Sequence, residues 1–215
     1  MKPGVYGISN TAAVATTAIK DQLRNVKKDR ILAEAQHLFY TNGYRGTSLD
    51  AIAEAMHVTK PFVYGVYDKK ADILFEIFLQ SIHGSLDAVE GGAASSGTVS
   101  ERLAEVARRL TRVCIEQREA VAVFFREENS LEPEQRQVIA ELTGRFDNAL
   151  TCLLEEGVKA GEFNLLDART STLAIGGMIS WSYMWYRPNG RLSTEELMEQ
   201  MAQYALRIVG AGQLK

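Results

Sequence analysis

Residues 59–70 read TKPFVYGVYDKK, and the valines and aromatic side chains of this segment are typical of a β-strand. On a helical projection of about 100° per residue, its apolar residues instead gather within one third of the circumference: Phe62, Val63 and Val66. Its other residues fall on the opposite side: Lys60, Pro61, Tyr64 and Gly65. The segment therefore predicts a short amphipathic helix with one apolar face and one free face.

The sequence on both sides of this segment is also helical in pattern. Apolar residues recur at helical spacing from Val26 until TNG at 41–43, and a second stripe covers 49–56. Thr59 suits the N-cap of the middle helix, because Pro61 then lies in the first turn, where its missing N–H is not needed. Two short helices joined by a tight turn, with a longer helix in front of them, make a helix-turn-helix arrangement.

The remainder of the chain predicts helices alone, so the expected fold is all-α with about nine helices. Residues 1–24 are expected to form a mobile N-terminal arm. A DNA-binding domain is expected over 25–85, with its helix-turn-helix at 48–67, and GGAASSG at 91–97 is expected to end it. The C-terminal domain, over 98–212, contains five expected helices: 99–118, 119–129, 133–159, 167–186 and 193–209.

Composition excludes several classes of protein. The chain has 215 residues, 46% of them hydrophobic, and a net charge of −3. Residues 1–80 carry ten Lys and Arg against eight Asp and Glu, a net +2, which favours contact with a polyanion in this part alone. Signal-peptide and membrane-span patterns are absent, and the two cysteines suggest neither a disulfide framework nor a metal site. We expect a cytoplasmic protein without cofactor or metal.

The free face of the middle helix carries the chemistry of a DNA-reading surface. Lys60 offers a cation to a phosphate or a guanine, and Tyr64 offers a phenol to a phosphate oxygen. Pro61 can contact a thymine methyl group, and Gly65 lets the backbone come close to DNA. The alternative is that this helix belongs to an all-helical protein-interaction module without DNA binding, since short amphipathic helices with one lysine are common.

Residues 30–74, RILAEAQHLFYTNGYRGTSLDAIAEAMHVTKPFVYGVYDKKADIL, resemble the DNA-binding domain of the TetR family of transcriptional regulators. The resemblance implies a homodimer that binds a palindromic operator in successive major grooves, and a C-terminal domain that dimerises and holds an effector pocket. By matching position, Tyr64 and Lys70 would contact phosphates, and Thr47 would be the N-cap of the second helix and also touch phosphate. Arg45 and Thr59 complete the set of expected DNA contacts.

Two positions depart from the family pattern, and one of them is Lys69, which stands where the family commonly has a capping Ser, so that Asp68 is expected to cap instead. His57 stands where the family usually has a glycine in the turn, so we expect a positive φ angle at a residue that tolerates it only moderately.

The segment 175–192, IGGMISWSYMWYRPNGRL, is the most distinctive part of the C-terminal half. Its large side chains on one helical face, together with phenylalanines elsewhere, are expected to line a pocket for an apolar ligand: Phe124, Phe125, Phe146, Met178, Trp181 and Trp185. Arg126 could pair with an acidic group on that ligand, or could simply be exposed. Ordinary core packing and a dimer interface remain alternatives for the tryptophans.

Gly176 and Gly177 allow close approach of another helix, which suits a four-helix dimer interface; a local kink is the alternative. The segment is similar to TetR-family members that sense acyl-CoA or steroid-degradation intermediates. The motifs HExxH, GxSxG and the P-loop are absent, as is a GxGxxG after a strand, so no enzyme is expected. We expect a repressor that a small apolar or acyl-CoA-like effector releases from its operator.

Overall fold

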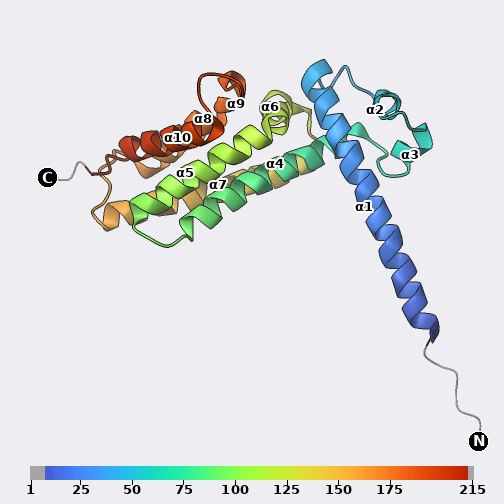
Figure 1. Cartoon of the computed structure of the whole chain (residues 1–215), viewed down its shortest axis with the longest axis horizontal. Coiled ribbons are helices and arrows are strands. Elements are labelled where there is room, and N and C mark those ends of the chain that lie inside the picture. The colour runs from blue at the N-terminus through green and yellow to red at the C-terminus, as the bar shows by residue number, and fades with distance from the viewer. Residues whose placement is uncertain (1–7, 213–215) are drawn as a thin grey trace, which may run out of the picture. The chain divides into compact units, whose positions relative to one another are not determined.

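The computed structural model describes the backbone of residues 8–212, and every regular element in that range is a helix. Figure 1 shows the order of these helices along the chain. They are α1 (Ile8–Asn42), α2 (Leu49–Ala55), α3 (Lys60–Tyr64), α4 (Lys70–Ala93), α5 (Val99–Glu116), α6 (Arg118–Glu127), α7 (Pro133–Lys159), α8 (Ala168–Ser180), α9 (Ser182–Trp185) and α10 (Thr194–Ile208), with a 3-10 turn at Glu128–Ser130. The all-α prediction is confirmed.

The chain forms two compact units, Met1–Ile73 and Leu74–Lys215, whose boundary falls inside α4. The first unit contains α1, α2 and α3 around a small apolar core: Ile31, Leu32, Ala35, Phe39, Leu49, Ile52, Ala53, Val63 and Tyr67. Gly43, at φ 77°, ends α1 in the left-handed region that glycine favours. The TNG stop signal is therefore the physical end of the first helix.

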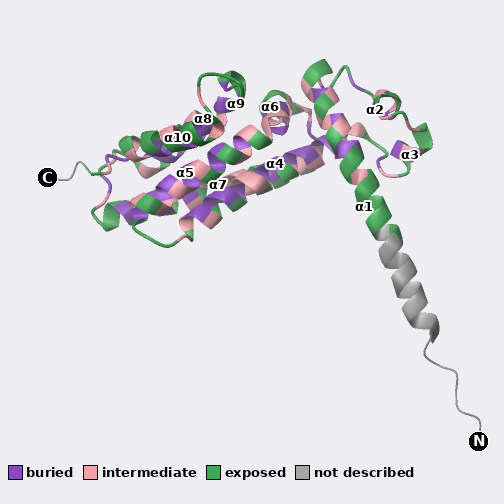
Figure 2. Cartoon of the chain, in the orientation of Figure 1, coloured by how far each residue is buried: buried purple, intermediate pink, exposed green. Residues whose placement is uncertain are grey.

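The second unit is built around α5, which contacts α6, α7, α8, α9 and α10. Its amphipathic face supplies the centre of the core: Leu103, Val106, Ala107, Leu110 and Cys114. Buried and exposed residues alternate along α4 and α5 at helical spacing (Figure 2). At the start of α5, Thr98 and Glu101 form a capping box, and the Glu162 carboxylate accepts hydrogen bonds from the Val99 and Ser100 N–H groups, at 3.0 and 2.8 Å.

Two boundaries differ from the sequence-based expectation. The arm expected over 1–24 lies partly on residues 1–7, outside the described residues, and residues 8–24 belong to α1. No Gly or Pro interrupts this alanine- and threonine-rich stretch, so nothing stops the helix from extending. Likewise α4 continues through Gly91 and Gly92, because Gly92 serves packing: a Cβ there would lie 2.7 Å from the Val106 Cα.

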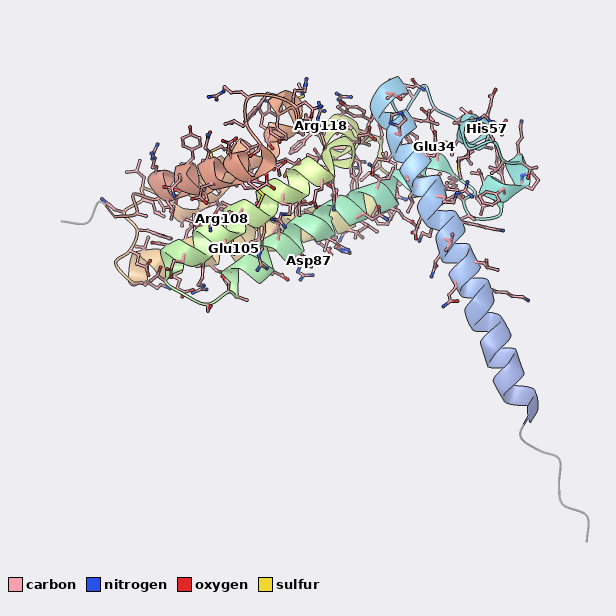
Figure 3. All side chains as sticks on the ribbon, viewed as in Figure 1. Glu34, His57, Asp87, Glu105, Arg108 and Arg118 are labelled. Atoms are coloured by element: carbon pink, nitrogen blue, oxygen red, sulfur yellow. The ribbon has the colours of Figure 1, made fainter. Side chains whose placement is uncertain are left out.

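The helix expected over 167–186 is interrupted at Trp181. Ser180 ends α8, and the short helix α9 follows from Ser182. The segment SWSYMWY is rich in serine and aromatic residues, which have lower helix propensity than Ala or Leu. Arg118 at the start of α6, labelled in Figure 3, donates from Nε to the Tyr183 carbonyl at 2.8 Å and so supports α9.

Candidate nucleic-acid interface and apolar cavity

The two faces of α3 lie as the helical projection predicts. Val63 is fully buried and Phe62 and Val66 are half-buried. The opposite face is exposed to solvent: Lys60, Pro61, Tyr64 and Gly65. Tyr67, just beyond this helix, is buried. The N–H groups of Gly65 and Tyr67 form helical hydrogen bonds, to the Pro61 and Val63 carbonyls.

Asp50 on α2 connects the two polar side chains of this face. Its Oδ2 accepts from the Lys60 Nζ at 2.5 Å, and its Oδ1 accepts from the Tyr64 hydroxyl at 3.1 Å. The hydrogen bond with Lys60 lowers the pKa of Asp50 and raises the pKa of Lys60, so both are charged at neutral pH. The bond to Asp50 likewise raises the pKa of Tyr64, which remains a neutral phenol. Asp50 therefore holds Lys60 and Tyr64 in place on the free face.

Sequence reasoning assigned Asp50 no role at this surface, although it is the acidic residue in the first turn of α2. Its distance of ten and fourteen residues from its partners gives no periodic signal. Only the angle between α2 and α3 brings the carboxylate over the exposed face.

The turn between α2 and α3 confirms one prediction and corrects another. His57 has φ 54°, the left-handed conformation that the family normally assigns to glycine (labelled in Figure 3). Thr59 occupies the N-cap of α3 as predicted, yet its side chain makes no capping hydrogen bond. The Phe62 N–H donates to the Thr59 backbone carbonyl at 2.9 Å rather than to its side chain.

Two predicted DNA contacts have other roles. Ser48, not Thr47, is the N-cap of α2, and its hydroxyl accepts from the Ala51 N–H at 3.1 Å. Thr47 is only 2% exposed, and its hydroxyl donates to the Gly43 carbonyl at 2.9 Å. It therefore faces the interior rather than a phosphate.

Lys70, the first residue of α4, contacts the connection between α1 and α2. Its Nζ donates to the carbonyls of Tyr44 and Thr47, at 2.8 and 2.9 Å, and lies 4.3 Å from the centre of the Tyr44 ring. In this structure the ammonium group stabilises the α1–α2 connection. Arg45, in the same connection, is exposed and remains available as a DNA contact.

The second unit contains an apolar cavity of about 270 Å³ between α4, α5, α6, α7 and α8. Three predicted pocket residues line it: Phe124, Phe125 and Phe146. The sequence did not single out the small and hydroxyl-bearing residues that line the rest, among them Ser81, Thr143, Thr172 and Ser180. A Cβ added at Gly176 would lie 3.6 Å from the Phe146 ring, which lines the cavity. The absence of a side chain at this position therefore widens the cavity and does not serve contact with another helix.

The other predicted pocket residues lie outside the lining. Trp181 and Trp185 are 55% and 47% exposed, Arg126 is exposed, and Met178 packs against the core. The Trp181 N–H still donates to the Gly177 carbonyl as in a continuous helix, and Trp181 lies on the exposed face that also carries Leu173 and Gly177. Trp181 is nevertheless connected to the cavity, because its ring packs on Tyr183, which stacks on Phe125 with centroids 5.7 Å apart.

Most of the polar groups that line the cavity are neutral hydroxyls. Burial raises the pKa of the Cys114 thiol to about 12, so it is protonated at neutral pH. Asp147 is the charged lining residue, and its Oδ2 lies 3.5 Å from the Arg169 guanidinium. Such a site suits an apolar ligand with at most a few hydrogen-bonding groups.

Among the residues that the structure describes, no cluster of three or more His, Cys, Asp or Glu could hold a metal ion. No described helix is both long enough and apolar enough to cross a membrane.

A helix-turn-helix with an exposed Lys and Tyr on its second helix, followed by a helical unit with an apolar cavity, defines a ligand-responsive DNA-binding protein. Residues 31–77 match the family model for bacterial regulatory proteins of the tetR family, and residues 96–209 match the tetracyclin repressor-like C-terminal domain. The chain belongs to the TetR family of transcriptional regulators.

Relatives with known names cover most of the chain. It is 26% identical over 151 residues to the fatty acid metabolism regulator protein of Bacillus subtilis (strain 168), covering 70% of this chain and 78% of that protein. It is 24% identical over 185 residues to the HTH-type transcriptional repressor KstR2 of Rhodococcus jostii (strain RHA1), covering 84% and 89%. The crystal structure of PfmR from Thermus thermophilus aligns with a TM-score of 0.77 at 30% identity, covering 83% and 97%.

Proposed function

We propose that this regulator represses transcription by binding a palindromic operator as a homodimer and leaves it when an apolar effector fills the cavity of the second unit. The observation that carries the proposal is the exposed α3 face, on which Asp50 holds Lys60 and Tyr64 in one orientation. Pre-positioned side chains lose less conformational entropy when they bind, which favours a specific contact. Because the operator is genomic DNA, the protein is proposed to act in the cytoplasm.

The dimer surface is proposed to include the exposed side of α8 and α9. Three exposed residues follow one another at four-residue spacing on this side: Leu173, Gly177 and Trp181. The side chains of Leu173 and Trp181 are each 55% exposed. Gly177 has no other atom within 4 Å of an ideal Cβ, so a helix could approach closely there. Contiguous exposed apolar residues of this kind are typical of protein interfaces.

The effector is proposed to be an acyl chain or a similar apolar group. At about 30 Å³ per water-sized group, a cavity of 270 Å³ holds about nine such groups. Its described lining contains no cation, so a coenzyme A moiety or a free carboxylate would remain at the mouth. The name of the Bacillus subtilis relative, a fatty acid metabolism regulator, supports an effector of this class.

The test is a selection of genomic fragments with the purified protein, followed by release with acyl-CoA thioesters from butyryl to lauroyl. The proposal predicts a palindromic consensus, and release by thioesters whose chain fits the cavity. Trp181 packs on Tyr183, which stacks on Phe125 of the cavity wall, so tryptophan fluorescence should report the same binding without DNA. Failure to enrich any sequence would refute operator binding, and enrichment without release would refute this effector class.

A further inference from the structure

In the first unit, α1 and α3 enclose a groove of about 260 Å³ that extends the exposed face of α3. The α1 side of the groove carries Lys20, Arg24 and Lys27, and the α3 side includes Pro61 and Gly65. The two α3 residues belong to the face proposed to read DNA, so the groove and that face form one continuous surface.

The charged residues described in the lining of this groove are all cations, and all three are exposed: Lys20, Arg24 and Lys27. Spacings of four and three residues place them on one side of α1, over about 10 Å of helix axis. The Lys27 Nζ lies 5.1 Å from the centre of the Phe62 ring, which fixes one of the three charges relative to α3.

Gly65 leaves the α3 side of this groove free of a side chain at its position. Its φ is −74°, so no left-handed conformation requires glycine at this position. An ideal Cβ would approach only the Pro61 carbonyl, at 3.0 Å, and would otherwise project into open space. A side chain there would therefore occupy the groove, which gives a reason for a glycine that weakens the end of a short helix.

We propose that the sugar-phosphate backbone of the operator lies in this groove, so that α1 forms a second DNA-contacting element beside α3. The inference rests on the proposed DNA binding and adds residues to that site. The three cations lie within about 10 Å along α1, close enough to contact neighbouring phosphates of one DNA strand. Charge complementarity favours this occupant, because contacts to the phosphate backbone depend on cations and not on base sequence.

The experiment compares the salt dependence of operator binding for two double variants of the full-length protein. Lys20→Ala/Arg24→Ala removes two groove cations, and Lys159→Ala/Arg191→Ala removes two exposed cations of the second unit as the matched control. Each lost phosphate contact reduces the magnitude of the slope of log K against log salt by about 0.9, and the variant removes two contacts from each protomer of the dimer, so the slope should fall by about 3.6. The control should keep the wild-type slope.

A wild-type slope in the groove variant would overturn the inference. If the wild-type protein binds no duplex at all, the proposed function fails and not merely this extension of it. Ethylation interference gives a second readout: ethylation of the phosphates that face the groove should block operator binding by the wild type but not by Lys20→Ala/Arg24→Ala, whereas phosphates contacted by α3 should block both. Identical interference patterns for the two proteins would also overturn the inference.

Discussion

Replacing Gly176 by Ala tests whether the cavity of the second unit is open space. Gly176 lies inside α8, where Ala is favoured over Gly by about 1 kcal/mol. The new methyl group would meet only the Phe146 ring, at 3.6 and 3.9 Å, which is ordinary van der Waals contact. We therefore expect the free energy of unfolding to rise by about 1 kcal/mol, and the cavity to shrink by one methyl group.

Gly144→Ala is the matched control, since Gly144 lies inside α7, has nothing within 4 Å of an ideal Cβ, and does not line the cavity. Both variants should raise the melting temperature by about 2–4 °C, as expected for a chain of this size. Only Gly176→Ala should also weaken release from the operator by acyl-CoA. Thermal unfolding followed by circular dichroism and anisotropy of labelled operator DNA give the two readouts.

The reasoning would be refuted if Gly176→Ala destabilises the protein while Gly144→Ala stabilises it. That result would mean that Phe146 packs directly on α8 and leaves no space there. An equal loss of effector response in both variants would show that the response does not pass through the cavity wall.

Three further predictions concern stability. His57→Gly should raise the free energy of unfolding by up to about 1 kcal/mol, because it removes a left-handed φ of 54° from a residue with a Cβ, whereas His57→Val should lower it; urea unfolding would show the opposite signs. Gly157→Ala should cost about 1–3 kcal/mol, because its Cβ would lie 2.1 Å from the buried Phe163 ring, and an unchanged melting temperature would contradict this packing. Hydrogen bonds from Ser100 lower the pKa of Glu162, so its contribution is complete above the unfolded pKa of about 4.3 and is lost as the pH falls through the lower folded pKa. Glu162→Gln should therefore flatten the acid limb of a stability-pH profile, and an unaltered profile would exclude this cap as its source.

The sequence predicted the parts of the fold that periodicity encodes. The two faces of α3 follow from the projection of seven residues, because a helix places every residue at a known angle. The strand-like composition of FVYGVY is misleading only if its residues are not projected at the helical angle of about 100° per residue. The positive φ of His57 was also predictable, since it stands where the family uses glycine.

What could not be predicted depends on one-residue registers and on contacts between helices. Thr47 and Ser48 are both good N-cap residues, and only the folded turn shows that Ser48 caps α2 while Thr47 faces inward. Trp181 shares a helical face with Met178 in the projection, but the packing of α8 leaves Trp181 on the exposed face. Asp50 meets Lys60 through the angle between two helices, which sequence spacing does not encode.

The central claim, that the exposed face of α3 binds DNA, is tested most directly by operator affinity at several salt concentrations for the wild type and for Tyr64→Phe. Tyr64 is 45% exposed, and its hydroxyl contacts only an exposed carboxylate, so the variant should unfold at the wild-type temperature. The account predicts weaker binding to the operator and to unrelated duplexes alike, through a lost phosphate contact. Unchanged affinity for both, with the melting temperature lowered, would contradict it and identify Tyr64 as a structural residue.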